Sequence, residues 1–259
     1  MGYDSIIADM IWSYSRITSF EDCPYRFLSH YVMRTEPEPR FFSDYGSFVH
    51  KLLGAYLSGE LQESALAARY LTGFRENVRC AAPNEKVFSG YFRDGLEYLT
   101  SPGFPHDRIL AVEQTYDFQV FGKPFTGVID CVAETPDGIA VVDHKSRNLK
   151  PRSGRSKKTA SDRELDKYLR QLYLYAIPVR EVFGSYPARL QFNCFRERVW
   201  IDEPFVPEVF EGTKRWAFDL TERIERCEKW NPDIEFWKCR YICDCSGSCD
   251  YWKMFGGEK

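Results

Sequence analysis

Three consecutive segments between residues 109 and 145 alternate apolar and polar side chains, and this run constrains the fold of the 259-residue chain more than any other. A side-chain period of two is typical of β-strands, so we expect strands over 109–120, 125–134 and 139–145. The linkers FGKP and TPDG are short, and TPDG has Pro at its second position and Gly at its fourth. Strands joined this closely pair with their neighbours, which predicts an antiparallel meander.

Helical patterns surround the meander. Helices are expected over 13–33 (with Ser13 or Ser15 as N-cap), 43–57, 60–100 with an interruption near 81–84, 162–176 and 207–229. The segment TEPEPR ends the first helix, residues 101–106 form a loop, and a further strand is expected near 187–201. Helices on both sides of a small mixed sheet indicate an α/β or α+β fold.

The length suits a single domain over 1–259. We divide it into a mainly helical part over 1–105, a sheet core with the candidate site over 106–205, and a C-terminal helix with a cysteine-rich tail over 206–259. No apolar run approaches the ~20 residues of a membrane-spanning helix, and the start lacks a basic region followed by an apolar block. We therefore expect no membrane partner and a cytoplasmic location.

Two acids and a lysine are expected to converge on the meander. Asp143 and Lys145 share one face of the third strand, whereas the side chain of His144 points to the other. If Glu134 lies opposite Ile139, Asp130 lies opposite Asp143, with Cβ atoms ~5 Å apart. Two carboxylates this close favour a bound cation such as Mg²⁺ or Mn²⁺. The alternative is a solvated ladder of ion pairs.

A basic segment follows the third strand. Residues 147–158 contain six cations and no acid, although the net charge of the chain is −3. A nucleic-acid-binding protein needs only a local basic footprint, whereas most charge runs are simply solvated. The candidate nucleic-acid-binding residues are Arg147, Lys150, Arg152, Arg155, Lys157 and Lys158.

Nine cysteines are present, and five of them form a pattern. Cys239, Cys243, Cys245 and Cys249 fall within eleven residues, and Cys23 stands alone in the first predicted helix. Without a secretion signal, such dense thiols favour a metal site over disulfides. Four thiolates can hold an iron–sulfur cluster or a zinc ion, and unligated thiols are the third possibility.

The segment GVIDCVAETPDGIAVVDHKS resembles the core motif of RecB-type nucleases in the PD-(D/E)XK superfamily. Three other segments resemble family motifs in the same order: GSFVHKLL with its histidine, AVEQTYDF with its Val-Glu strand, and QLYLY with its glutamine and tyrosine. The resemblance implies a restriction-endonuclease-like fold, which has a mixed sheet flanked by helices. It also implies metal-dependent hydrolysis of DNA phosphodiesters.

The resemblance also implies roles for particular residues. The catalytic residues would be Asp130, Asp143, Lys145, Gln171 and Tyr175. The ligands of Mg²⁺ or Mn²⁺ would be His50, Asp130, Asp143 and the backbone carbonyl of His144. Glu113 would either support this site or merely line a strand. Independently of the family, His50 shares a helix face with Gly46 and Gly54, which would let that helix approach another backbone closely.

The cysteine pattern resembles the iron–sulfur members of this group, which include the AddB subunit and the CRISPR-associated exonucleases. In those proteins one N-terminal cysteine joins three C-terminal ones around a 4Fe–4S cluster. This implies that Cys23, Cys239, Cys243 and Cys249 are the ligands and that the cluster joins the two ends of the chain. Cys245 is surplus and is an alternative fourth ligand, and zinc is an alternative metal.

The function expected from the sequence is that of a deoxyribonuclease. We expect an exonuclease acting on single-stranded or end-containing DNA in recombination, repair or phage DNA metabolism. Trimming of spacer precursors in CRISPR adaptation is one alternative, and a non-catalytic nucleic-acid-binding subunit is another. Because no Gly-x-x-x-x-Gly-Lys-(Ser/Thr) motif is present, unwinding of DNA would need a helicase or recombination partner.

Overall fold

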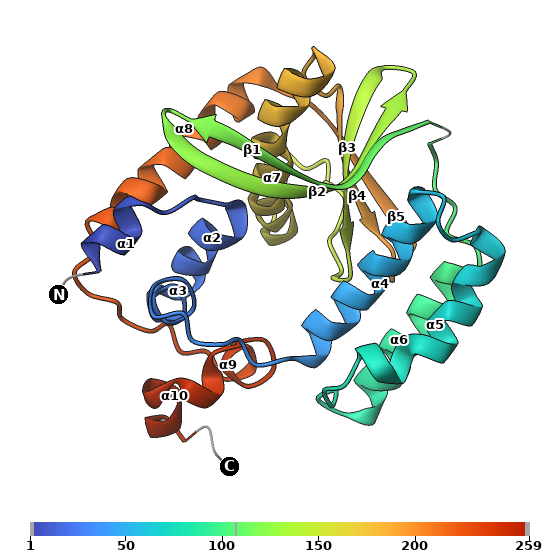
Figure 1. Cartoon of the computed structure of the whole chain (residues 1–259). Coiled ribbons are helices and arrows are strands. Elements are labelled where there is room, and N and C mark those ends of the chain that lie inside the picture. Colours follow the sequence, from blue (N-terminus) through green and yellow to red (C-terminus); the bar gives the residue numbers. More distant parts are fainter. Residues whose placement is uncertain (1–2, 107, 257–259) are drawn as a thin grey trace.

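The computed structural model describes residues 3–106 and 108–256, and a five-stranded sheet in the order β1-β2-β3-β4-β5 lies at its centre (Figure 1). The neighbouring strands pair antiparallel except β3 and β4, which pair parallel. The sheet is therefore mixed, as predicted, and the meander forms its first three strands. The strands are β1 (Ile109–Val120), β2 (Lys123–Thr135), β3 (Gly138–Lys145), β4 (Arg189–Cys194) and β5 (Val199–Pro204).

Two-residue loops fix the register of the meander. Phe121 and Gly122 both have positive φ values, 47° and 83°, as a type I′ hairpin turn requires. This turn pairs Val120 with Lys123. The second loop pairs Thr135 with Gly138, and Glu134 then lies opposite Ile139, as predicted.

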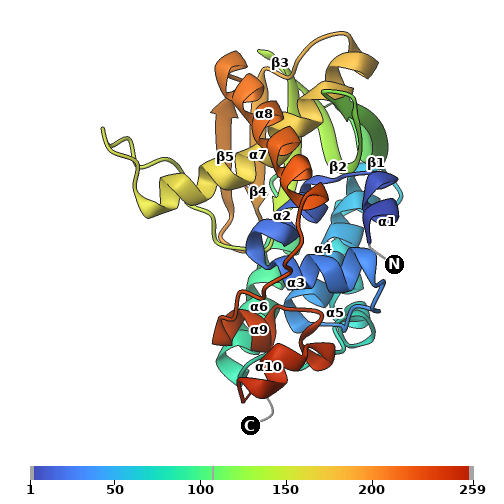
Figure 2. The same ribbon diagram turned by 90° about the vertical axis from the view of Figure 1, so that its left-hand side faces the viewer.

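Helices cover both faces of the sheet (Figures 1 and 2). On one face α7 (Ala160–Phe183) packs against β1, β3 and β4, and α8 (Pro207–Glu225) packs against α7. On the other side α4 (Phe41–Leu57) contacts β1 and β2, and α5 (Glu63–Asn77) and α6 (Glu85–Thr100) pack beside it around an aromatic core. The parallel β3–β4 pair needs a crossover connection, and α7 provides it.

The prediction of one continuous helix over 13–33 is wrong. It is divided into α2 (Tyr14–Asp22), α3 (Pro24–Phe27) and a π-helical turn, η1 (Leu28–Val32). Cys23 adopts an extended conformation with φ −169° and ψ 108°. The cause is Pro24, because a proline disfavours the helical conformation of the residue before it. Of the two predicted N-caps, Ser13 is the one that accepts a hydrogen bond from the backbone of Arg16.

Other boundaries also differ from the predictions. The strand predicted over 187–201 is β4 and β5, separated by a turn in which Arg198 has a positive φ. The helix predicted over 162–176 continues through the buried Pro178 to Phe183, and the helix predicted over 207–229 ends at Glu225. Four short elements were not predicted: α1 (Asp4–Ala8), α9 (Phe236–Tyr241), η2 (Ser246–Ser248) and α10 (Asp250–Met254).

The C-terminal tail lies beside the N-terminal helices (Figures 1 and 2). The Lys238 amine donates a hydrogen bond to the backbone carbonyl of Asp22, and the backbone N–H of Glu38 donates to that of Asp244. Tyr25 and Tyr251 pack edge to face with ring centroids 4.9 Å apart. Among the helices of the described residues, none has the length and apolar character needed to cross a bilayer.

Candidate active site

Three carboxylates lie in one row across β1, β2 and β3. The β1–β2 register passes from Val112↔Cys131 to Gln114↔Ile129, which places Glu113 opposite Asp130. The β2–β3 register ends at Cys131↔Val142, which places Asp130 opposite Asp143. Regular strand pairing is interrupted along this row, because neither Glu113 and Asp130 nor Asp130 and Asp143 form a regular backbone pair.

Two local features redirect this row. Glu113 has a φ of 48°, a left-handed conformation that costs a residue other than glycine about 1–3 kcal/mol. The backbone N–H of His144 donates a 2.7 Å hydrogen bond to Oδ2 of Asp130 instead of to a strand carbonyl. The two strands therefore separate where Asp130 projects, and its carboxylate is held by a backbone donor.

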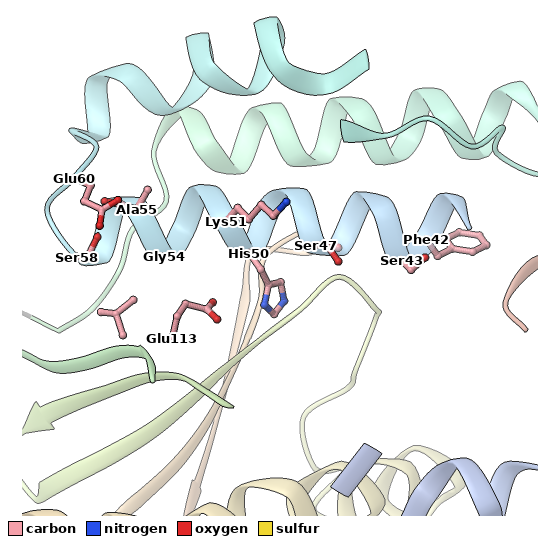
Figure 3. A pocket seen from close by; sticks show the side chains of 12 residues that line it. Phe42, Ser43, Ser47, His50, Lys51, Gly54, Ala55, Ser58, Glu60 and Glu113 are labelled. Carbon is pink, nitrogen blue, oxygen red and sulfur yellow. The ribbon is translucent and has the colours of Figure 1, made fainter. Parts of the chain in front are cut away.

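Helix α4 brings His50 to this row (Figure 3). Nδ1 of His50 lies 3.5 Å from Oδ2 of Asp130. His50, Glu113 and Asp130 each offer a ligand atom within 4.8 Å of the others. Gly54 permits the close approach of α4, because a Cβ atom at this position would lie 3.0 Å from Cγ of Glu113. The close approach predicted for this helix therefore occurs at Gly54, which lies against Glu113 of β1.

The electrostatics of the triad fit a divalent cation. Burial and the neighbouring charge of Asp143 raise the pKa of Asp130 well above its usual value, and the same two causes raise the pKa of Glu113. Burial lowers the pKa of His50, which favours the neutral imidazole that a metal ligand requires. A hard cation bound by these oxygens would offset the repulsion that otherwise favours protonation.

Lys145 is held in place on the α7 side of the row. Its Nζ lies 2.6 Å from Oδ2 of Asp143 and donates a 3.0 Å hydrogen bond to Oε1 of Gln171. Nε2 of Gln171 in turn donates to the hydroxyl of Tyr175 at 3.1 Å. The ring of Tyr175 packs on Gly127, where a Cβ atom would lie 2.5 Å from Cε1. The structure thus brings together the five residues expected to be catalytic.

His144 occupies the opposite face of β3 from Lys145. Its ring is buried, and Nδ1 lies 3.1 Å from Nδ2 of Asn193, which also donates to the Tyr98 hydroxyl at 2.6 Å. The side chain is therefore part of a buried polar network behind the site. Its backbone N–H bonds to Asp130, and its ring packs edge to face on the ring of His50 with centroids 5.7 Å apart.

Glu113 is the residue that sequence reasoning left undecided and that the structure places beside His50 and Asp130. A signal for it was present. A two-residue hairpin loop at Phe121-Gly122 pairs Val120 with Lys123, and counting back along both strands places Glu113 opposite Asp130. Without a turn type for FGKP, the sequence does not assign the register between the first and second strands.

The basic segment is only partly available to a ligand. Arg152 pairs with Asp166 at 2.8 Å and Glu203 at 2.5 Å, and Lys158 pairs with Asp166 at 2.6 Å. Arg147 lies 3.6 Å from Glu164 and stacks on the ring of Tyr168, which Lys145 also approaches. Within the described residues, no ion pair is found for the remaining three exposed cations, Lys150, Arg155 and Lys157. The segment that precedes α7 extends away from the sheet (Figure 2).

Four of the five patterned cysteines influence one another. Burial raises the pKa of the Cys239 thiol, and the charges of Cys243, Cys23 and Cys249 raise it further. The pKa of Cys249 is raised in the same way by burial and by Cys243 and Cys23. The tail thus lies near Cys23, at the break between α2 and α3, and within the described residues no three of these four sulfur atoms lie within 4.8 Å of one another.

Cys245 has a different environment from the other four. Its hydrogen bond to Cys243 lowers the pKa of the Cys243 thiol to about 6, which makes Cys243 a thiolate at neutral pH. The Cys245 side chain is buried, and its sulfur lies 3.7 Å from Oδ1 of Asp244. Cys245 therefore acts here as a protonated donor, whereas Cys243 has the form that binds metals.

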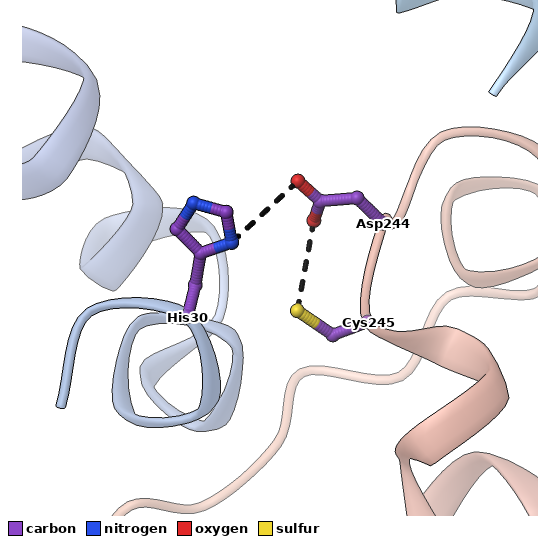
Figure 4. Close-up of side chains that lie close together, drawn as sticks. All are labelled: His30, Asp244 and Cys245. Carbon is purple, nitrogen blue, oxygen red and sulfur yellow. Dashed lines mark hydrogen bonds and ion pairs between the residues drawn. The ribbon is translucent and has the colours of Figure 1, made fainter. Parts of the chain in front are cut away.

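Asp244 and Cys245 also approach His30 (Figure 4). Nδ1 of His30 lies 3.9 Å from Oδ2 of Asp244. The guanidinium of Arg26, however, already pairs with Oδ1 of Asp244 at 2.8 Å. An arginine in contact with the carboxylate supplies the positive charge that a metal would bring, so we interpret this group as an ion-pair network that fixes the tail to α3 and η1.

Comparison with known proteins gives a family and a fold. A solved structure from Eubacterium rectale, described as a "Putative exonuclease", has 13% identity and a TM-score of 0.52, and the match covers 95% of this chain and 93% of that one. A second structure, SSO0001, has 17% identity over 79% of this chain and 95% of that one, but its TM-score of 0.31 is too low to support an argument. A search of curated proteins gave no match.

The Eubacterium rectale structure shows a shared overall fold. Its sequence identity of 13% is too low to show a shared activity. A sequence profile described as "PD-(D/E)XK nuclease superfamily" matches residues 11–250. This range includes the row of carboxylates, Lys145, His50 and the cysteine tail as far as Cys249. The five-stranded mixed sheet with helices on both faces agrees with the restriction-endonuclease-like fold of that superfamily. The chain belongs to the PD-(D/E)XK nuclease superfamily.

Proposed function

We propose that this protein is a Mg²⁺- or Mn²⁺-dependent deoxyribonuclease of the RecB-like type, an exonuclease that hydrolyses single-stranded or end-containing DNA. The observation that carries the proposal is the row of Glu113, Asp130 and Asp143, flanked by His50 and Lys145. The shared fold of the Eubacterium rectale structure agrees with this assignment. Action in recombination, repair or phage DNA metabolism, inside the cell and beside a helicase partner, is part of the same proposal.

His50, Glu113 and Asp130 would hold the ion, together with Asp143 and the backbone carbonyl of His144. A divalent ion in such a site polarises a phosphoryl oxygen and lowers the pKa of a bound water. The His144 N–H keeps the Asp130 carboxylate oriented, because it donates directly to Oδ2. Burial lowers the pKa of His50, which favours the neutral imidazole, and one ring nitrogen of that form has a free lone pair for a metal ion.

Lys145 would bind the phosphate or orient the attacking water. Asp143 and Gln171 hold its amine at 2.6 Å and 3.0 Å, and Tyr175 orients Gln171. A preorganised cation stabilises the charge that develops on the phosphate without reorganisation during the reaction. Gln171 and Tyr175 thus serve mainly to position Lys145.

We further propose that Cys23, Cys239, Cys243 and Cys249 hold a 4Fe–4S cluster, as in the AddB-like members of the group. The lowered pKa of Cys243, and the effect of the neighbouring thiols on the pKa values of Cys239 and Cys249, support this ligand set. Such a cluster would stabilise the fold rather than take part in hydrolysis. If the purified protein contains zinc at these cysteines and no iron or sulfide, the site is a zinc site and not a 4Fe–4S cluster.

The test of the nuclease proposal uses end-labelled linear and circular single-stranded DNA, and linear duplex DNA, with Mg²⁺, Mn²⁺ or EDTA. We expect degradation of the linear DNAs with either metal and none with EDTA. Asp143→Asn and Lys145→Ala should each lower the rate by a factor of about 10² or more. Asp117→Asn is the matched control, since Asp117 is an exposed carboxylate on the same sheet.

Two results would contradict the proposal in different ways. Degradation of circular DNA at the rate of linear DNA would exclude an exonuclease. If the wild-type protein binds DNA but degrades none of it with either metal, the chain is a non-catalytic binding subunit. Circular dichroism of each variant shows that a lost activity is not a lost fold.

A further inference from the structure

A groove of about 690 Å³ runs beside α4 and contains two residues of the triad, His50 and Glu113 (Figure 3). One side of the groove is formed by small residues that share a face of the helix, namely Ser43, Ser47, Gly54, Ala55 and Ser58. The other side is formed by Val112 and Glu113 of β1. Any ligand lying in the groove would therefore be in contact with the candidate metal site.

Lys51 is the lysine in the lining of this groove, which also includes the acids Glu60 and Glu113. It follows His50 on α4 and is exposed, and its side chain lies along the helix, whereas the ring of His50 points toward the sheet (Figure 3). Across residues 3–106 and 108–256, no ion pair involving Lys51 is found. This contrasts with Arg147, Arg152 and Lys158 of the basic segment, whose charges are offset by acids. Lys51 is therefore ready to pair with an anionic ligand.

The dimensions and chemistry of the groove fit a single nucleic acid strand. Its volume lies in the range of pockets that hold one ligand of small-molecule size, so it can take a nucleotide unit of one strand. The Ser47 hydroxyl can donate to a phosphate or sugar oxygen, the groups that most protein contacts to DNA use, whereas the hydroxyls of Ser43 and Ser58 donate to the backbone carbonyls of Arg40 and Ala55. Small side chains between these serines leave room for the sugar–phosphate backbone.

We propose that a single DNA strand lies along this groove during hydrolysis and that Lys51 binds the phosphate next to the scissile one. This assignment rests on the proposed nuclease function and makes it more specific. Lys51 is a substrate-binding residue, distinct from Lys145, which faces the scissile phosphate.

Binding tests the assignment without relying on turnover. A fluorescein-labelled oligothymidylate is titrated with protein that carries Asp143→Asn to prevent cleavage, with and without Lys51→Ala, at several salt concentrations. Loss of one phosphate contact should weaken binding severalfold at low salt and reduce the slope of log Kd against log salt by about 0.7. Lys51→Arg should retain the affinity. Lys86→Ala, an exposed lysine on the neighbouring α6, should change nothing.

A second variant tests the groove itself. Ser47→Trp places a large side chain in it and leaves Lys51 and the triad unchanged. We expect weaker binding of the oligothymidylate and a lower kcat/KM, with unaltered Mn²⁺ binding measured by calorimetry in the absence of DNA. In the Asp143-containing protein, Lys51→Ala should raise KM and leave kcat nearly unchanged.

The outcomes separate this inference from the nuclease assignment. If the wild-type protein degrades DNA, while Lys51→Ala and Ser47→Trp both bind and cleave as well as wild type, the groove assignment is overturned and the nuclease assignment remains. A reduced salt slope in Lys86→Ala equal to that in Lys51→Ala would also overturn it. If wild type degrades no DNA with either metal, the nuclease assignment fails, and the groove assignment fails with it.

Discussion

The unusual backbone of Glu113 is the residue-scale feature that shapes the candidate metal site. A φ of 48° is unfavourable for glutamate, yet it turns the carboxylate toward His50 and Asp130. Strained residues of this kind persist when the surrounding structure fixes them. Here the constraint comes from α4, whose Gly54 lies directly against the Glu113 side chain.

Gly54→Ala should separate stability from metal binding. Alanine favours a helix over glycine by about 1 kcal/mol, so the melting temperature should not fall. The added Cβ would lie 3.0 Å from Cγ of Glu113 and should displace that carboxylate. We expect Mn²⁺ affinity, measured by calorimetry, to fall about tenfold, as for other changes that disturb the orientation of a ligand.

Gly46→Ala on the same helix is the matched control. A Cβ atom there would lie 3.6 Å from Oγ of Ser146, which is an ordinary contact. It should give the same gain in helix stability with no loss of metal affinity. Equal Mn²⁺ affinities in the two variants would show that Glu113 is not a ligand.

At the scale of elements, the N-terminus of α7 anchors the basic segment to the site. The Asp162 carboxylate accepts hydrogen bonds from the backbone and hydroxyl groups of both Ser153 and Thr159. These bonds cap the helix and hold the preceding segment. Because α7 also carries Gln171 and Tyr175, its position determines where Lys145 is held.

This cap predicts a dependence of stability on pH. The hydrogen bonds from Ser153 and Thr159 lower the pKa of Asp162 below its value of about 3.9 in an unfolded chain. A lowered carboxylate pKa stabilises the fold above that unfolded value, and the contribution is lost as the pH falls through the folded pKa. Asp162→Ala should therefore lower the melting temperature at pH 7, and the difference from wild type should shrink towards pH 2.

Differential scanning calorimetry between pH 7 and pH 2 measures this difference. Asp219→Ala, a change of an exposed carboxylate on α8, should show little difference from wild type at any pH. A difference for Asp162→Ala that stays constant with pH would mean that the charge of the carboxylate does not contribute to the cap.

At the scale of the whole molecule, the cysteine tail connects the two ends of the chain. Cys23 and Cys239 are 216 positions apart (239 − 23), and the tail is also held by the pair of Arg26 with Asp244. Closing so long a loop restricts the unfolded chain strongly, and metal binding at the cysteines would add directly to folding free energy.

Cys23→Ser should give colourless protein with a lowered melting temperature, because one ligand of the proposed cluster is lost. Visible absorption, iron and sulfide content, and thermal unfolding measure these effects on protein purified without oxygen. Cys80→Ser is the control, since Cys80 lies outside the group of interacting thiols and should leave both colour and stability unchanged. A brown, fully folded Cys23→Ser protein would exclude Cys23 as a ligand. Colourless wild-type protein that contains zinc would show that the site binds zinc and not an iron–sulfur cluster.

Local chemistry in the sequence was sufficient to predict the meander, and it predicted the register of the second and third strands on the condition that Glu134 lies opposite Ile139. Side chains alternate with period two in a strand, and the TPDG loop fixes the pairing, so the opposition of Asp130 and Asp143 follows from short-range rules. Lys145 on the face of Asp143 follows in the same way. The break at Cys23 also had a local signal in Pro24, and only the length of the apolar stripe led to a single predicted helix. The division of the chain at 105 and 205 remains a prediction.

Only the tertiary structure decided which distant segments meet. His50 comes from α4, Gln171 from α7 and Cys23 from the break after α2, and no spacing rule relates them to β2, β3 or the tail. Pairings of this kind depend on how helices pack on the two faces of the sheet, which is set by the sum of many apolar contacts. For the same reason the acids that neutralise Arg152 and Lys158, and the groove that leaves Lys51 unpaired among the described residues, had no counterpart in the local sequence.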